Sequence, residues 1–66
     1  MSVAKVTEIT SMSTKSFEDA VEQGVAKASK TIRNIKSAWI QDQEAVVEDG
    51  RVTMFKVSMK LTFVID

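Results

Sequence analysis

The segment from Arg51 to Ile65 alternates between apolar and polar side chains more regularly than any other part of the chain. Its alternating apolar residues are Phe55, Val57, Met59, Leu61, Phe63 and Ile65. Because successive side chains of a strand point to opposite faces, the pattern predicts one strand with a single apolar face. At about 3.3 Å per residue this strand spans roughly 50 Å, whereas a compact domain of this size has a radius of gyration near ~11 Å. The strand must therefore curve strongly or extend beyond its own domain.

Two different patterns precede this strand. Residues 3–10 are rich in Val, Thr and Ile, which favours another strand, and residues 11–16 read as a polar loop. A stripe of apolar residues with helical spacing then follows, formed by Phe17, Ala20, Val21, Gly24, Val25, Ala28, Ile32 and Ile35. We expect Ser16 to cap this helix, with Asp19 three positions later, and Gly24 to permit close packing on the sheet.

Residues 35–47 are predicted to form a second long strand, with a bulge near residues 45–47. The dipeptide Asp49-Gly50 between two strand-like segments indicates a hairpin turn. The order is therefore strand, helix, long strand, turn, long strand, in one domain that covers residues 1–66. We expect an α+β fold.

The apolar surface of two long strands exceeds what one helix can cover. A chain of 66 residues has a marginal core, and without cysteine it has no disulfides to strengthen it. Association with further copies of the same chain is the remaining way to bury the surplus. We therefore expect a homo-oligomer.

Composition argues against several functions. Nine basic residues balance nine acidic ones, so we expect no nucleic-acid partner. The first ten residues hold no apolar run long enough for a signal peptide, and no segment could span a bilayer, so we expect a cytoplasmic protein without a membrane partner. Histidine, cysteine and a glycine-rich phosphate loop are all missing, and we therefore expect no enzymatic activity.

Several strings resemble the dodecin family of small flavin-binding proteins. They are "SFEDAVEQGVAKASKTIRNI" at residues 16–35, "EDGRV" at 48–52 and "FKVSMKLTF" at 55–63. The family pattern there reads Ser-Trp-Glu-Asp-Ala, Ala-x-Ala-Ser-Lys-Thr-x-Arg-Asn, Gly-Lys-Val and an aromatic-Gln-Val run. The resemblance implies a β-α-β-β fold, a three-stranded antiparallel sheet wrapped around one helix, and a hollow homododecamer. It also implies FMN or another flavin bound where subunits meet.

The flavin-binding positions depart from the family pattern. Ser37 stands where the family has a tryptophan that stacks on the flavin ring, and Lys56 stands where it has a glutamine that bonds the pyrimidine edge. Serine has no aromatic face, and lysine cannot accept a hydrogen bond. The single tryptophan, Trp39, lies one pleat repeat further on the same face. The candidate ligand-binding residues are therefore Ser37, Trp39, Gln41 and Lys56, with Gln43 expected to share the face of Trp39.

The alternatives to these assignments stay open. Trp39 either contacts a ligand or packs at a subunit interface, and Lys56 is either a solvated or ion-paired lysine or a contact to an anionic group. The main hypothesis is a dodecin-like homododecamer that binds flavin for storage and photoprotection. The alternative is a flavin-free cage, in which a divalent cation such as Ca²⁺ is held by candidate ligands Asp42, Glu44, Glu48 and Asp49.

Overall fold

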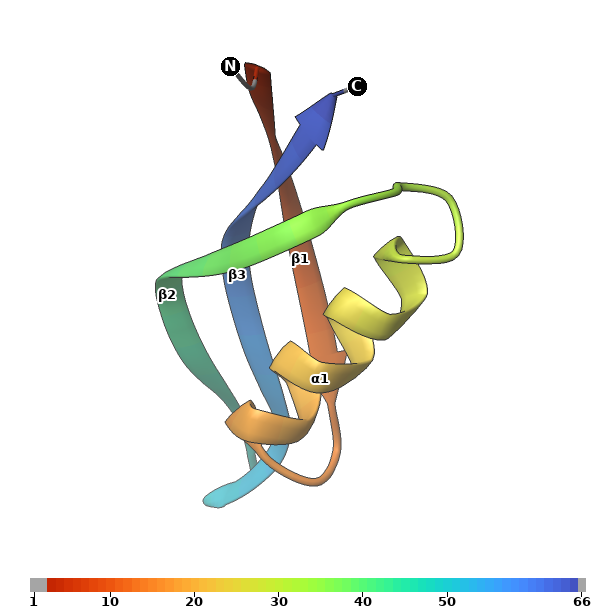
Figure 1. Ribbon diagram of the computed structural model, residues 1–66. Helices are drawn as coiled ribbons and strands as arrows, with labels where there is room; N and C mark the ends of the chain where they lie inside the picture. The colour runs from red at the N-terminus through yellow and green to blue at the C-terminus, as the bar shows by residue number, and fades with distance from the viewer. Residues whose placement is uncertain (1–2, 66) are drawn as a thin grey trace.

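The computed structural model describes residues 3–65, which form one helix and three strands. Strand β1 spans Val3–Ser13, helix α1 Phe17–Ala28, strand β2 Ile35–Glu48 and strand β3 Arg51–Ile65. All neighbouring strands are antiparallel, and their order in the sheet is β1-β3-β2, so the longest strand lies in the middle (Figure 1). The predicted α+β class and β-α-β-β order are confirmed.

Helix α1 lies across one face of the sheet, which we call the inner face (Figure 1). It packs against β1 and β3. The core lies between these elements and consists of Ala20, Val57, Met59 and Leu61, each with no solvent exposure. The alternation of β3 therefore places its apolar residues under the helix, as predicted. On the opposite face, which we call the outer face, residues 3–65 form no second layer (Figure 1).

The start of the helix agrees with the expected cap. The Asp19 backbone N–H donates to Ser16 Oγ at 2.9 Å. The Asp19 carboxylate accepts a bond of 2.6 Å from Ser13 Oγ, and Ser13 Oγ in turn accepts from the Lys15 N–H at 2.9 Å. Through these bonds the buried hydroxyl of Ser13 connects the end of β1 to the first turn of α1.

The helix is shorter than its apolar stripe predicted. It ends at Ala28: the Ser29 N–H and Oγ both donate to the Val25 carbonyl, at 2.9 and 2.7 Å, and the next two N–H groups, of Lys30 and Thr31, bond the carbonyls three residues back. Asn34 then adopts a left-handed φ of 61°, which redirects the chain into β2. Consequently Ile32, the next-to-last residue of the predicted stripe, belongs to the connection and not to the helix, whereas Ile35 begins β2, as the predicted second strand had it.

Gly24 is needed for the close contact between α1 and the sheet. A Cβ atom at this position would lie 2.9 Å from Ser11 Cβ and 3.0 Å from Met59 Cε. Real side chains do not approach so closely, and therefore any larger residue would separate the helix from β1 and β3. The expected close packing at Gly24 is confirmed.

The β2–β3 hairpin turns at two residues with left-handed backbone. Asp49 has a φ of 51° and Gly50 a φ of 74°, which is the geometry of a tight two-residue hairpin. The predicted bulge appears at Val46/Val47. Two further shifts in register, at Ile35/Ser37 and Ile40/Asp42, were not anticipated.

The shift at Ile40/Asp42 changes which side chains share a face. Gln43 lies opposite Val57, a core residue, and therefore lies on the inner side of the sheet. The expectation that Gln43 shares the face of Trp39 is wrong, because the extra residue in the bulge reverses the alternation beyond it.

The subunit is elongated. Its principal extents are 51 × 20 × 13 Å, and its radius of gyration is 13.5 Å. The paired ends of β1 and β3, which carry both termini, extend away from the helix (Figure 1). The long strands therefore leave large apolar side chains exposed, as the sequence predicted: Val3, Val6, Met12, Trp39, Val47, Val52 and Ile65.

Candidate functional site on the outer face of the sheet

The outer face is organised in rows that cross the three strands. β3 supplies the centre of each row, and the register places one residue of β1 and one of β2 beside it. From the hairpin end, the rows are Met12–Lys56–Glu44, Thr10–Ser58–Asp42, Glu8–Lys60–Trp39 and Val6–Thr62–Ser37. Three of the four candidate ligand-binding residues, Ser37, Trp39 and Lys56, thus lie on one face within four consecutive rows.

Trp39 dominates this face. Its side chain is 67% exposed, although it is the largest apolar group of the chain. Lys60, directly opposite on β3, places its Nζ atom over the indole ring, 5.7 Å from the ring centroid. This distance is that of a cation–π contact. One ring face is therefore occupied by an ammonium group within the subunit.

Ser37 lies in the row next to Trp39. It is exposed and in register with Thr62, and β1 contributes Val6 to the same row. The sequence placed Ser37 and Trp39 on a common face one pleat repeat apart, and the register agrees. The row that would hold a stacking tryptophan by the family pattern is instead lined by two small hydroxyl side chains and a valine.

Gln41 is the extra residue of the bulge between Ile40 and Asp42, and no residue of β3 is in register with it. Its side-chain Nε2 atom is buried and has no hydrogen-bond partner among residues 3–65. A buried amide without a partner is unfavourable by about 1–3 kcal/mol. Gln41 therefore has an unused hydrogen-bond donor. It belongs to none of the four rows, whereas simple alternation had placed it on the face of Trp39.

Lys56 forms an ion pair with Glu44, its cross-strand neighbour. Lys56 Nζ lies 3.3 Å from Glu44 Oε1, and the two side chains are 40% and 65% exposed. At this exposure the pair stabilises the fold by at most about 1 kcal/mol. Of the two readings of Lys56, the structure of the single subunit thus contains the ion-paired one.

The four acidic candidates for a cation site are spread along β2 and its turn. Glu44 is paired with Lys56, Asp42 lies opposite Ser58, and Glu48 lies opposite Arg51. Among residues 3–65 no three acidic side chains are grouped closely enough to hold a metal ion. A cation site built from these residues would therefore need carboxylates from more than one subunit.

Sequence reasoning missed Lys60. The alternation of β3 placed it on the outer face, but its contact with Trp39 depends on the register between β2 and β3. Between the hairpin turn and this pair lie the predicted bulge at Val46/Val47 and the unanticipated one at Ile40/Asp42, so only a correct assignment of both bulges would have indicated the pair.

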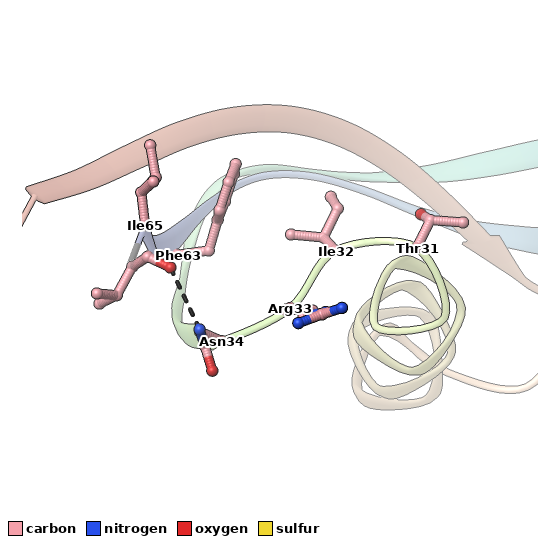
Figure 2. A pocket seen from close by; sticks show the side chains of 7 residues that line it. Thr31, Ile32, Arg33, Asn34, Phe63 and Ile65 are labelled. Atoms are coloured by element: carbon pink, nitrogen blue, oxygen red, sulfur yellow. Dashed lines mark hydrogen bonds between the residues drawn. The ribbon is translucent and has the colours of Figure 1, made fainter.

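Two hollows lie elsewhere on the subunit. One lies between the α1–β2 connection and the end of β3, where Asn34 Nδ2 donates to the Val64 carbonyl at 3.4 Å (Figure 2). The other lies between β1 and α1, beside Gly24. Neither is lined by the candidate ligand-binding residues.

Among residues 3–65 the single helix is too short to cross a bilayer.

Comparisons with known proteins agree with this geometry. The family model described as Dodecin matches residues 3–66. Dodecin from Streptomyces coelicolor is 29% identical, with a TM-score of 0.93 over 98% of this chain and 93% of that one. Dodecin from Streptomyces davaonensis is 26% identical, with a TM-score of 0.93 over 98% and 96%.

A more distant structure shares the fold. It is described as a calcium-chelating immunodominant antigen, calcium dodecin, from Mycobacterium tuberculosis, and it is 23% identical, with a TM-score of 0.84 over 97% of this chain and 91% of that one. A search of curated proteins gave no match. The family match, the strand order and the helix on one face of the sheet lead to one conclusion: the chain belongs to the dodecin family.

Proposed function

We propose that this protein assembles as a homododecamer and binds a flat aromatic ligand, with FMN or another flavin as the expected ligand, without catalysing a reaction. Flavin binding is the typical role of the dodecin family, and dodecamers are its known assembly. Binding would occur where the outer faces of neighbouring subunits meet. The inherited role would be storage and photoprotection, since a stacked flavin has its excited state quenched.

The exposure of Trp39 is the observation that carries this proposal. An indole that is 67% exposed on a sheet face without a second layer offers one open aromatic surface. Aromatic rings stack with favourable energies of about 0.5–1.5 kcal/mol beyond their area burial. A flat ligand between Trp39 side chains of two subunits would cover both indoles.

The neighbours of Trp39 supply different contacts. Ser37, in the next row, offers a hydroxyl at the edge of a stacked ring, and its small size leaves room for the ligand. The buried Nε2 of Gln41 could donate to a ring carbonyl after a small rotation of its side chain. Lys56 could contact an anionic group only after release from Glu44.

Assembly is supported by the apolar side chains on the outer face. Val6, Met12 and Trp39 all lie on this face and are more than half exposed. Val6 shares a row with Ser37, and Met12 shares a row with Lys56. Every row that holds one of the candidate residues Ser37, Trp39 and Lys56 therefore also holds an exposed apolar side chain. Contact with another subunit would remove them from water, and burial of apolar surface is the main favourable term in association.

A titration with FMN tests the ligand proposal. Trp39 is the only tryptophan, so its fluorescence reports on this one site. We expect mutual quenching of Trp39 and flavin, with a dissociation constant at or below the micromolar range, and the Trp39→Leu variant should lose binding by flavin fluorescence. Absence of quenching at high FMN concentration would contradict the proposal.

A second function, a flavin-free cage, is favoured by one specific observation. The Lys56–Glu44 ion pair occupies the row where the family pattern has a glutamine, and Ser37 supplies no aromatic face. In such a cage Trp39 would fill the vacated pocket, and carboxylates of several subunits could hold Ca²⁺, the ion named for the distant mycobacterial structure. Light scattering and thermal unfolding with and without chelator test the ion, because an unchanged mass and melting temperature would exclude a structural role.

A further inference from the structure

Lys60 lies between two partners on the outer face. Glu8 is opposite it on β1 and Trp39 is opposite it on β2. Directly opposite charges on neighbouring strands commonly pair. Here, however, Lys60 Nζ lies over the Trp39 ring, and Lys60 and Glu8 form no ion pair in the part of the chain that the structure describes. The ammonium group thus sits on the indole although a carboxylate is available.

This contact restricts an otherwise mobile side chain. A largely exposed tryptophan on a sheet can change its ring orientation, and ordering such a side chain upon binding costs conformational entropy. A cation placed over one ring face favours the ring orientation that keeps this contact. It also covers one ring face, so that a ligand meets the opposite face in a defined geometry.

We propose that Lys60 is a positioning residue for the ligand site. It backs one face of the Trp39 indole and thereby presents the other face, already oriented, to a flat ligand. This inference rests on the proposed function. It assigns Lys60 a role that acts through Trp39 and requires no contact between Lys60 and the ligand.

Three variants test this role. Lys60→Met keeps the aliphatic chain without the charge, Lys60→Arg keeps a cation that can stack on the indole, and Lys30→Met is the matched control at an exposed position in the turn after α1. Without ligand, the near-ultraviolet circular dichroism of Trp39 should decrease in Lys60→Met and persist in the other two. Unchanged Trp39 signals in Lys60→Met would overturn the proposal.

Binding measurements separate positioning from direct contact. FMN and riboflavin share the ring system and differ by a phosphate. Lys60→Met should weaken both by the same factor, about two- to fivefold, the range expected for an exposed cation–π contact, and Lys60→Arg should restore both. A larger loss for FMN than for riboflavin would mean that Lys60 contacts the phosphate, and it would overturn the positioning role.

Glu8→Gln gives an independent check if Lys60→Met assembles poorly. Removing the competing carboxylate should leave ligand affinity unchanged or increase it, because Lys60 stays on the ring. Weaker ligand binding by Glu8→Gln would show that Glu8 is needed to hold Lys60 in its binding-competent position, contrary to the proposal. If wild-type protein shows no quenching with either flavin, the proposed function itself fails, and the circular dichroism comparison still decides whether Lys60 orients Trp39.

Discussion

The two faces of β3 differ in how much of their surface is buried within a single subunit. On the inner face Val57, Met59 and Leu61 are completely buried beneath α1. On the outer face the intervening residues of β3 are half-buried, and their neighbours Trp39, Val6 and Met12 are exposed. The helix covers only one face, and the apolar side chains of the outer face are left without cover in the single subunit. The first face therefore accounts for the buried core of the subunit, and the second is the face on which we propose that a ligand binds.

The largest effect should come from the inner face. Met59→Ala removes a fully buried side chain that contacts the helix at Gly24, and it should lower the free energy of unfolding by about 2–5 kcal/mol. Ser58→Ala, the adjacent residue on the outer face, should change it by less than about 1 kcal/mol, since its bond to Thr10 is exposed. Denaturant unfolding of both variants measures the difference. Equal losses would show that the two faces contribute alike.

Assembly tests the outer face directly. We expect light scattering at micromolar concentration to give about twelve times the 7.3 kDa mass of one subunit. The melting temperature should rise with protein concentration, because association stabilises only the folded state. A stable monomer at micromolar concentration would mean that the outer face needs no partner.

The junction between β1 and α1 gives an intermediate effect. Ser13→Ala deletes the buried hydroxyl that bonds Asp19 and Lys15, and it should destabilise the protein by about 1–3 kcal/mol. Thr14→Ala, at the exposed next position, is the matched control. Thermal unfolding should separate the two variants. An unaffected Ser13→Ala protein would show that the cap at Ser16 suffices.

The sequence predicted the inner face far better than the outer one. Alternation in β3 and helical spacing in α1 sufficed to identify the core, because burial under one helix depends on local periodicity. The Asp49-Gly50 turn was also clear, since its backbone geometry favours those residues. The helix end at Ala28 was not predicted, because the apolar stripe continues past the point where the backbone changes to bonds between residues three apart and then turns at Asn34.

The candidate site was predicted in composition but not in detail. The sequence placed Ser37 and Trp39 correctly on one face. It placed Gln43 on the wrong face, because the prediction did not include the bulge at Ile40/Asp42. Bulges have no strong sequence signal, yet each one reverses the side-chain alternation beyond it. The contact of Lys60 with Trp39 lies beyond the bulge at Ile40/Asp42 and depends on it, whereas the pairing of Lys56 with Glu44 depends on the bulge at Val46/Val47; local patterns alone could identify neither pair.

The smallest expected effect concerns the affinity of the outer face for a flavin. The double substitution Ser37→Trp with Lys56→Gln restores the stacking ring and the amide of the family pattern. One stacked aromatic pair contributes about 0.5–1.5 kcal/mol, so affinity for FMN should rise by up to about tenfold.

Flavin fluorescence serves as the measurement for this substitution, since the variant has two tryptophans. Thr62→Ala, in the same row as Ser37, is the control for a mere change of volume. Tighter binding with wild-type assembly would show that the ligand occupies the Ser37 row as well as the Trp39 row. Weaker binding would show that the ligand stacks on Trp39, one pleat repeat along β2 from the family position, and that a tryptophan at position 37 obstructs it. Either result locates the ligand relative to Trp39, because the two positions differ by one row on an otherwise unchanged face.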